Sequence, residues 1–313
     1  MADILTLTMN PALDIYTSID RVVPNHKLRC AAAQNHPGGG GINVARVIHR
    51  LGGDVLALFT AGGVTGQVLQ ALLQAEHIPA QAIDIAGETR ESFSVHETGS
   101  QQDFRFVLPG PTLSPSEAAT SLQRLADLAS SARYVIASGS LPPGIPDDFY
   151  AQVTAQVQAL GSRMVLDTSG PALRAALQAG GVHLVKPSLR ELRELTGLPL
   201  DTEADWCAAA RALIAQGQTE IVALSLGEEG ALLVSATQAW RAQALQVEVA
   251  STIGAGDSFL AALVWALSQS QDLATALRQA MAAGAAALLS SGTALSQPAD
   301  MARLLPAVQL RPA

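Results

Sequence analysis

Short apolar strands alternate with longer helical stretches from residue 115 to residue 225, and this alternation limits the folds open to the chain. The predicted helices are 115–131, 146–160, 171–178, 191–195 and 203–216, and the predicted strands are 134–137, 163–167, 183–185 and 220–225. Strands joined by such helices pair in parallel, and a parallel sheet is covered by helices on both faces. The alternation therefore predicts an α/β fold with a doubly wound, mostly parallel sheet. Ligands of such sheets bind at the carboxyl ends of the strands.

Two stretches near the N-terminus interrupt this pattern. Residues 12–34 and 88–108 contain alternating polar and β-branched pieces, which are typical of half-covered hairpins. The first is expected to turn at Pro24-Asn25 and the second at Thr98-Gly99-Ser100. We therefore predict a single domain over residues 1–313 with a small, discontinuous β lid. Three short strands, at 231–235, 239–243 and 246–249, are expected to form a meander later in the chain.

Gly254-Ala255-Gly256-Asp257 lies directly before an apolar run, residues 259–266, that is predicted to be a buried helix. The glycines let the backbone approach a ligand closely, and the first amides of a helix favour an anion such as a phosphate. A carboxylate beside a phosphate site is easiest to explain as a base that takes a proton from an attacking hydroxyl. An ordinary N-cap aspartate is the alternative, and this stretch alone leaves it open.

Four consecutive glycines, Gly38 to Gly41, run directly into the predicted helix 42–51. A flexible linker is the plain alternative, but linkers are rarely joined directly to an amphipathic helix. We interpret the run as a ligand loop at a helix N-terminus.

Polar residues also follow several predicted strands, at Asp14, Ser138 to Ser140, Lys186 and Ser225 to Gly230. In a doubly wound sheet these positions share one crevice. Lys186 is either a nucleotide-phosphate contact or an ordinary strand-end lysine. Residues 225–230 are either a tight turn or a shelf against a nucleotide.

Composition narrows the class of partner. Nineteen basic and 27 acidic side chains give a net charge of −8, which speaks against nucleic acid as a partner. Cys30 and Cys207 offer neither a metal-ligand spacing nor a disulfide framework, as is usual in a reducing compartment. The N-terminus has no signal-peptide pattern, and the Ala-rich segment 281–289 is too short to cross a bilayer. We expect a cytoplasmic protein with a small-molecule partner and no membrane contact.

The two glycine-rich stretches together resemble the paired signatures of the pfkB (ribokinase-like) carbohydrate kinases, over essentially the whole chain. Residues 27–30, 105–110 and 138–144 resemble the phosphosugar-kinase branch of that family. The resemblance implies a three-layer α/β/α sandwich with a β lid that commonly also forms a homodimer contact. It implies phosphorylation of a sugar phosphate by ATP with Mg²⁺, in this branch fructose 6-phosphate to fructose 1,6-bisphosphate in glycolysis. Fructose 1-phosphate and tagatose 6-phosphate stay open as substrates.

The resemblance also implies roles for individual residues. Asp257 matches the catalytic base, and Gly254, Ala255 and Gly256 match an anion hole for the transferring phosphoryl group. The residues that match sugar-phosphate contacts are Asp14, Lys27, Gly39, Gly40, Asn43, Arg90, Arg105 and Ser140. The residues that match nucleotide contacts are Lys186, Ser188, Ser225, Gly227 and Gly230. Glu191 matches a residue that orders Mg²⁺-bound water. The residues that match a monovalent-cation site, usually for K⁺, are Ser251, Ile253, Ala287, Ser290 and Gly292.

The implied contacts agree with simple chemistry, because a dianionic phosphate favours cations and arginine can bind it through two hydrogen bonds. For Lys27, Arg90 and Arg105 taken singly, a solvated surface charge is the plain alternative.

Three positions depart from the family pattern. Ser188 replaces an asparagine and cannot donate two bonds, which puts Mg²⁺ or nucleotide affinity in question. Ser251 replaces an aspartate, and Ser290 replaces an asparagine of the cation site, so a K⁺ requirement is also in question.

Two other classes of function compete with a kinase. The departures motivate a non-catalytic sugar-phosphate or nucleotide sensor on the same fold, but the intact Asp257 and anion hole argue against it. A dinucleotide-dependent dehydrogenase is excluded, because no Gly-x-Gly-x-x-Gly follows the first strand.

Overall fold

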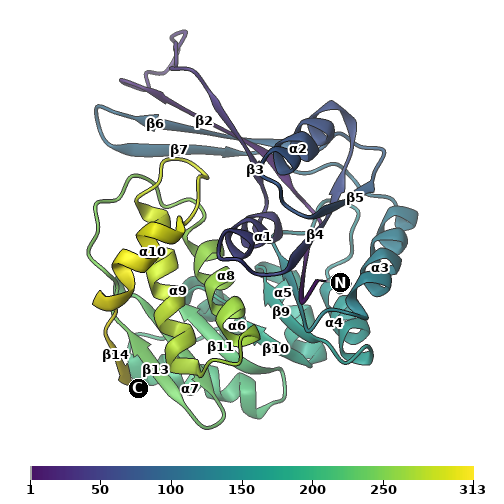
Figure 1. Ribbon diagram of the computed structural model, residues 1–313, viewed down its shortest axis with the longest axis vertical. Helices are drawn as coiled ribbons and strands as arrows, with labels where there is room; N and C mark the ends of the chain where they lie inside the picture. The colour runs from purple at the N-terminus through teal and green to yellow at the C-terminus, as the bar shows by residue number, and fades with distance from the viewer. Residues whose placement is uncertain (1) are drawn as a thin grey trace.

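Alternating side chains on the strands of a long sheet bury two separate cores. On strand β8 (Tyr134–Ser138), Tyr134 and Ile136 belong to one core, whereas Val135 and Ala137 belong to the other. Successive side chains of a strand point to opposite faces, so this strand is covered on both sides. The computed structural model describes residues 2–313 and shows helices on each face of this sheet (Figure 1).

The large sheet has ten strands in the order β14-β13-β12-β11-β10-β9-β8-β1-β4-β5. The strands between β5 and β11 in this order pair in parallel. The other three, β12, β13 and β14, form antiparallel pairs: β12 with β11, β13 with β12, and β14 with β13. Besides β8, its strands are β1 (Ile4–Thr8), β4 (Val55–Ala61), β5 (Ala80–Asp84), β9 (Arg163–Asp167), β10 (Val182–Val185), β11 (Thr219–Ser225), β12 (Ala231–Ser235), β13 (Ala239–Ala242) and β14 (Leu310–Pro312).

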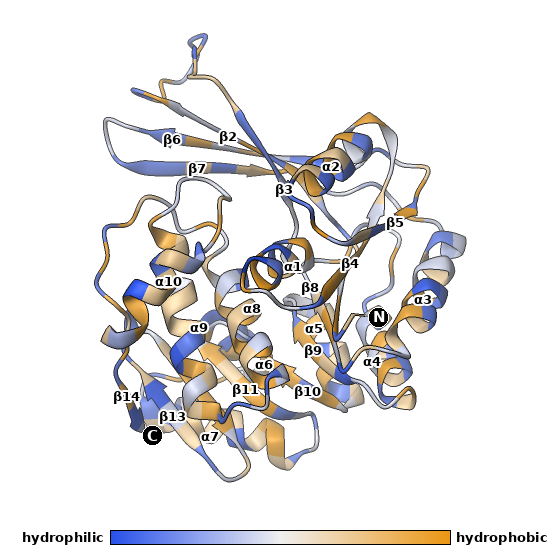
Figure 2. Cartoon of the chain, in the orientation of Figure 1, coloured by the Kyte–Doolittle hydropathy of each residue, from blue (hydrophilic) through white to orange (hydrophobic). Residues whose placement is uncertain are grey.

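Two groups of helices form the outer layers. One core is completed by α1 (Gly40–Arg50), α2 (Gly63–Ala75), α8 (Ala255–Ser268), α9 (Leu273–Leu288) and α10 (Pro298–Leu304). The other is completed by α3 (Pro115–Ala129), α4 (Phe149–Ala159), α5 (Gly170–Ala179), α6 (Leu189–Thr196) and α7 (Glu203–Ala215). Figure 2 shows hydrophobic strands such as β9 to β11 between these layers. The predicted three-layer α/β/α sandwich is confirmed. Within residues 2–313, no helix has the length and apolar character needed to cross a membrane.

A second sheet of four strands lies apart from the sandwich, at the top of Figure 1. Its strands, in the order β3-β2-β6-β7, are β3 (Gln34–Gly38), β2 (Ala12–Ile19), β6 (Arg90–Glu97) and β7 (Gln102–Val107). The chain thus builds this sheet from two separate segments, with β2 and β6 paired in parallel. Its strand β3 leads directly into the glycine run and α1.

The hairpin predicted around Pro24-Asn25 forms in part, since β2 pairs antiparallel with β3, but its second strand begins later than predicted. Asn25 does turn, with a φ of 63°, but no strand follows it until Gln34. Residues 20–33 run as a mostly exposed segment that we call the projecting segment. It is tied to the second sheet by bonds of Thr17 and Ser18 with Ala31, and by bonds of its Asp20 and Val22 with Gly99 and Glu97. Proline removes a ladder donor, so the residues around Pro24 could not continue the pairing.

The predicted strand 246–249 is also wrong. After β13 the chain crosses to the start of α8 instead of turning back, so the edge of β13 is left to β14 from the C-terminus. Arg311 of β14 pairs with Glu203 at 2.6 Å, which secures that edge.

Candidate active site

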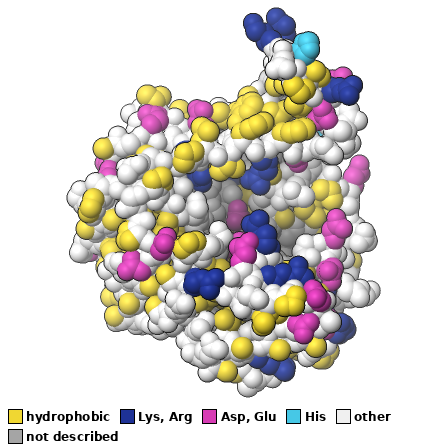
Figure 3. Space-filling view, turned by 180° about the vertical axis from the view of Figure 1, so that it is seen from behind, with side chains coloured by type: hydrophobic (Ala, Val, Ile, Leu, Met, Phe, Trp, Pro, Cys, Tyr) yellow, Lys and Arg dark blue, Asp and Glu magenta, His cyan; other side chains and the backbone are white. Residues whose placement is uncertain are grey.

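A cavity of about 340 Å³ lies between the second sheet and the carboxyl ends of the parallel strands. Figure 3 shows the hollow, with Lys, Arg, Asp and Glu side chains around it. The predicted site residues that line it are Asp14, Gly39, Gly40, Asn43, Arg90, Arg105, Ser140, Glu191, Ile253, Gly254 and Asp257. A larger hollow of about 470 Å³ lies between α5 and α6, but of these residues only Glu191 borders it. The smaller cavity is therefore the candidate active site.

The glycine run lets β3 and α1 approach the ends of two buried strands. Gly39 has a φ of +114°, which side-chain-bearing residues rarely adopt. A Cβ on Gly40 would lie 2.2 Å from the Ser138 Oγ at the end of β8. This close approach puts the first turn of α1, including Asn43, at the cavity wall.

The start of α8 forms another part of the wall. Gly254 is its N-cap in the left-handed conformation, with φ 76° and ψ 3°. The first amides of a helix have no partner within the helix, and they carry the positive end of its dipole. Gly254 also packs tightly, since a Cβ there would lie 2.3 Å from the Leu295 Cδ2. Ala255 and Gly256 follow as the first helical residues, so the predicted Gly-Ala-Gly stretch can present backbone donors to an anion.

Asp257 is half-buried at this helix start, and the Asn43 Nδ2 donates to its Oδ2 at 2.8 Å. Burial and the nearby Asp167 carboxylate raise the pKa of Asp257 to about 6, against the opposing effects of Asn43, Lys186 and Arg105. A carboxylate with this pKa is ionised at neutral pH and still accepts a proton, as a general base requires.

Lys186 pairs with Asp167, with 3.0 Å between the Lys186 Nζ and the Asp167 Oδ1. Burial alone would lower the pKa of Lys186, but the carboxylates of Asp167, Asp257 and Glu191 raise it, so the lysine is charged. The Ser138 Oγ donates to the Asp167 Oδ2 at 3.3 Å. Sequence reasoning missed Asp167, although its place at the end of buried strand β9 is the signal that marked Lys186.

The three predicted phosphate-binding cations differ in their surroundings. Arg105 lines the cavity and, within residues 2–313, has no ion pair or side-chain hydrogen bond. Arg90 donates to the carbonyls of Asn10, Pro11 and Leu108 at 2.9, 3.4 and 3.0 Å. Lys27 does not line the cavity; it is exposed in the projecting segment.

Asp14 lines the same cavity from strand β2. Burial raises its pKa to about 6, although the charges of Arg105, Arg46 and Arg90 oppose this. Ser140 lines the cavity too, and its Oγ accepts a bond from the Asn10 Nδ2 at 3.2 Å.

Ser188 and Glu191 form a capping box at the start of α6. The Ser188 Oγ accepts from the Glu191 N–H at 3.2 Å, and the Ser188 N–H and hydroxyl donate to the Glu191 Oε2 at 2.7 and 2.8 Å. This role was not predicted, although Ser-x-x-Glu is its signature. Ser225 lies beside this turn and donates its N–H to the Pro187 carbonyl at 3.0 Å.

The other predicted nucleotide residues lie in the turn from β11 to β12, and the predicted cation residues lie in the loop before α8 and at the end of α9. Gly227 and Gly230 both have positive φ in the turn from β11 to β12, and a Cβ on Gly230 would lie 2.2 Å from the Ala242 carbonyl oxygen. The loop before α8 meets the end of α9, where the Ser251 N–H donates to the Leu288 carbonyl at 3.3 Å. Ala287, Ser290 and Gly292 lie at or just after this end of α9, near Ser251 and Ile253.

A helix N-terminus, a half-buried carboxylate and a cation thus meet at one cavity, an arrangement suited to phosphoryl transfer. The chain matches the pfkB family of carbohydrate kinases over residues 7–300. It belongs to this family.

Known relatives agree over nearly the whole chain. An ATP-dependent 6-phosphofructokinase isozyme 2 from Mycobacterium tuberculosis is 47% identical over 300 residues, which cover 96% of this chain and 88% of that protein. A 1-phosphofructokinase from Xanthomonas campestris is 39% identical over 278 residues, covering 88% of this chain and 86% of that protein.

A solved structure agrees as well. Phosphofructokinase-2 from Escherichia coli in complex with fructose-6-phosphate has a TM-score of 0.92 at 37% identity, covering 98% of this chain and 99% of that chain. These findings confirm the predicted family and enzyme class, an ATP-dependent sugar-phosphate kinase.

Proposed function

We propose that the chain transfers the γ-phosphoryl group of ATP to fructose 6-phosphate and so forms fructose 1,6-bisphosphate. The observation that carries this proposal is the half-buried Asp257 at the start of α8, bonded to Asn43 and lining the same cavity as Arg105. The relatives named for 6-phosphofructokinase support this substrate, and the relative named for 1-phosphofructokinase keeps fructose 1-phosphate as the competing one. Tagatose 6-phosphate is the third candidate.

In this reaction a hydroxyl oxygen of the sugar forms a bond to the γ-phosphorus while the bond from that phosphorus to the ADP oxygen breaks. The hydroxyl proton passes to the Asp257 carboxylate. The amides that follow Gly254 stabilise charge on the transferring group, and loss of one such donor typically costs roughly 10²–10³ in rate. Asp14, Gly39, Gly40 and Asn43 hold the sugar hydroxyls, and Arg105 and Arg90 hold the phosphate already on the sugar.

ATP and Mg²⁺ fit the donors at the cavity. Mg²⁺ usually keeps several waters and takes one or two carboxylates together with substrate phosphates. Asp167 and Glu191 supply carboxylates at the cavity wall, and within residues 2–313 no cluster of three or more metal-ligating side chains competes for the ion. Lys186, Ser188, Ser225, Gly227 and Gly230 would hold the nucleotide.

A monovalent cation is proposed at the meeting of the loop before α8 with the end of α9. A structure of phosphofructokinase-2 from Escherichia coli is described as a complex with potassium. The residues proposed to hold the ion here are Ser251, Ile253, Ala287, Ser290 and Gly292. A titration of activity with K⁺ against Na⁺ tests this site, and equal activity in both ions would exclude a K⁺ requirement.

We also propose a homodimer formed through the outer face of the second sheet, which acts as a lid over the cavity. Arg105 faces the cavity, so the neighbouring Phe106 points to the opposite face, where it pairs in register with Phe93. Phe106 is 55% exposed and Phe93 37% exposed. Figure 3 shows hydrophobic side chains gathered over this sheet, and exposed apolar patches are typical of interaction sites.

The first test is ADP release with MgATP across fructose 6-phosphate, fructose 1-phosphate, tagatose 6-phosphate, fructose and ribose. The expected result is a strong preference for fructose 6-phosphate. Preference for another phosphosugar would keep the mechanism and change the substrate, and activity only on free sugars would refute the role of Arg105. Tight binding of ATP and sugar phosphate without product would indicate a sensor.

The same assay tests the base. Asp257→Asn should fold and bind ATP but lose roughly 10²–10⁴ in turnover, because general-base catalysis contributes about that much. Near-normal turnover in this variant would refute the role of Asp257.

A further inference from the structure

A buried arginine lies behind the cavity and does not line it. The side chain of Arg46, in α1, is only 1% exposed, and its guanidinium binds both carboxylate oxygens of Glu76 at 2.7 and 3.0 Å. Arginine stays charged under ordinary conditions, so the folded protein buries an ion at this position. A buried ion pair by itself is weak evidence of a contribution to stability.

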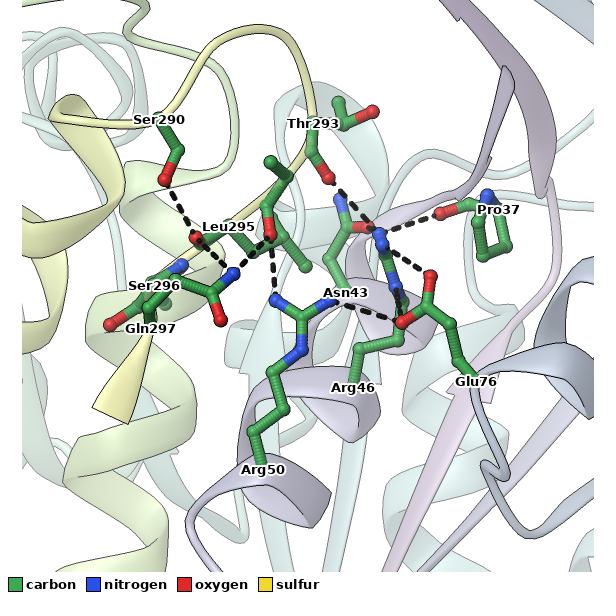
Figure 4. A network of polar contacts seen from close by, with 12 residues as sticks. Pro37, Asn43, Arg46, Arg50, Glu76, Ser290, Thr293, Leu295, Ser296 and Gln297 are labelled. Carbon is green, nitrogen blue, oxygen red and sulfur yellow. Dashed lines mark hydrogen bonds and ion pairs between the residues drawn. The ribbon is translucent and has the colours of Figure 1, made fainter. Parts of the chain in front are cut away.

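The remaining bonds of Arg46 reach three other parts of the chain (Figure 4). It donates to the Pro37 carbonyl of β3 at 3.0 Å, to the Thr293 carbonyl at 3.2 Å and to the Asn43 Oδ1 at 3.4 Å. One guanidinium therefore joins the strand that enters the glycine run, the first turn of α1 and the loop after α9.

The bond to Asn43 has a chemical consequence. A guanidinium carries five donors and no acceptor, so it selects the oxygen of the Asn43 amide. The nitrogen of that amide then faces Asp257, to which it donates at 2.8 Å. If the amide turned over, its oxygen would face the carboxylate and repel it.

Arg50, one helical turn later in α1, provides a contrast. It binds the Glu76 Oε2 at 3.0 Å and the Ala294 carbonyl at 2.6 Å, so it shares both the ion pair and the loop with Arg46. It has no bond to Asn43. A comparison of the two arginines therefore distinguishes two effects: holding the loop after α9, which both do, and orienting the Asn43 amide, which only Arg46 can do.

We propose that Arg46, fixed by Glu76, is a positioning residue that orients the amide of Asn43 so that its nitrogen faces Asp257. This inference rests on the proposed function of Asp257 as base. The charged groups that also face Asp257 are Asp14 of β2, Arg105 of β7, Asp167 of β9 and Lys186 after β10. None of these is hydrogen-bonded to Arg46, and lysine keeps the positive charge at position 46 that acts on Asp14, so their effect on Asp257 is nearly the same in the two lysine variants below.

The test compares Arg46→Lys with Arg50→Lys, each alone and in combination with Asn43→Ala. Arg46→Lys should lower kcat roughly 10- to 100-fold, the scale expected for misplacement of a catalytic group, and move the acid limb of the kcat profile to higher pH. Arg50→Lys should leave the position of that limb unchanged. Added to Asn43→Ala, Arg46→Lys should cost little more, because its effect passes through the amide.

A second measurement needs no turnover. The carboxyl group of Asp257 is titrated by NMR in protein labelled with ¹³C-aspartate and is assigned by its loss in Asp257→Asn. Arg46→Lys should raise the pKa of Asp257, and Arg50→Lys should not. An inactive wild-type protein in which this shift still occurs would refute the proposed function and leave the positioning inference standing.

Three outcomes would overturn the inference. One is an Asp257 pKa and an acid limb that Arg46→Lys does not move. Another is a loss of activity that adds fully to that of Asn43→Ala. If Arg46→Lys does not fold, Glu76→Gln, which keeps both arginines, takes its place with the same expected shifts; failure of both variants to fold would show that the pair serves folding instead.

Discussion

At the scale of single residues, two carboxyl groups of the cavity should set the response to pH. Burial raises the pKa of both Asp14 and Asp257 to about 6. The negative charge of Asp257 also contributes to the raised pKa of Asp14. A base works only when ionised, so activity should be full above this pKa and fall as the pH drops below it. Because the two groups interact, the pH profile of kcat/KM should show a pair rather than two separate ionisations.

Asp14→Asn separates the two contributions. The acid limb of kcat/KM should become shallower in this variant, since only Asp257 then gains a proton, and its midpoint should fall because one opposing negative charge is gone. Ionisation of the substrate phosphates is the same for both proteins and cancels in the comparison. An acid limb that keeps its slope and midpoint in Asp14→Asn would contradict the pairing.

Two arginines of the cavity should respond differently to substitution. Arg105→Gln should raise the KM for the sugar phosphate roughly 10- to 100-fold, since a hydrogen bond to a charged group is worth about 1.5–3 kcal/mol, and should leave the Tm nearly unchanged. Arg90→Gln should also lower the Tm, because the carbonyls of Asn10, Pro11 and Leu108 lose their donor. Kinetics and thermal denaturation of both variants check this. Equal losses of Tm in Arg105→Gln and Arg90→Gln would contradict a structural role that belongs to Arg90 and not to Arg105.

At the scale of elements, α6 depends on the serine that replaces the asparagine of the family pattern. Ser188→Ala should lower the free energy of unfolding by about 1 kcal/mol, because the N-cap bond to Glu191 is lost. Ser188→Asn is the matched control, since asparagine caps equally well and should keep the wild-type stability. Denaturant unfolding measures both, and an alanine variant as stable as wild type would show that the capping box contributes nothing.

The strands and helices of the sandwich could be predicted from the sequence because each is a local pattern. The alternation from residue 115 to 225 places β8 to β11 and their helices within a few residues of their observed ends. The wrong strand at 246–249 and the missed β14 share one cause. The partner of the β13 edge is set by the path of the chain through the whole fold. A local sequence pattern carries no information about that path.

The residues of the site also fall into those that a local pattern predicts and those that it does not. Residues on glycine-rich turns, such as Asp257 and Gly40, were predicted to be functional and do line one cavity. Arg46 and Glu76 could not be predicted, because their significance lies in a contact across 30 residues, between α1 and the C-terminus of α2. The position of Lys27 outside the cavity was also hidden, because the projecting segment has no regular structure.

At the scale of the whole molecule, the projecting segment and the apolar face belong to the same sheet. Lys27 is exposed and does not line the cavity of its own chain, yet a sugar phosphate calls for cations. A dimer formed through the face that carries Phe93 and Phe106 would bring each projecting segment to the other subunit. In the proposed dimer Lys27 would have a phosphate to bind, and the exposed aromatic side chains would be covered.

Phe106→Glu should therefore produce monomers, because it buries a charge in the proposed interface. Leu160→Glu, at the end of α4 and 39% exposed, is the matched control and should leave the dimer intact. Light scattering after size-exclusion chromatography, over a range of protein concentrations, reports the mass. A wild-type protein that is monomeric throughout, or a Phe106→Glu variant that stays dimeric, would contradict this interface.

Mixed subunits then test whether Lys27 acts across it. Lys27→Met and Asp257→Asn should each be nearly inactive as homodimers. After the two are mixed and allowed to exchange subunits, a heterodimer has one cavity with an intact Asp257 and an intact Lys27 from the neighbouring chain. Activity should therefore recover toward a quarter of the wild-type value at equal mixing, because half of the dimers are mixed and each has one complete site. If Lys27 acted within its own chain, neither cavity of the heterodimer would be complete and mixing would restore nothing.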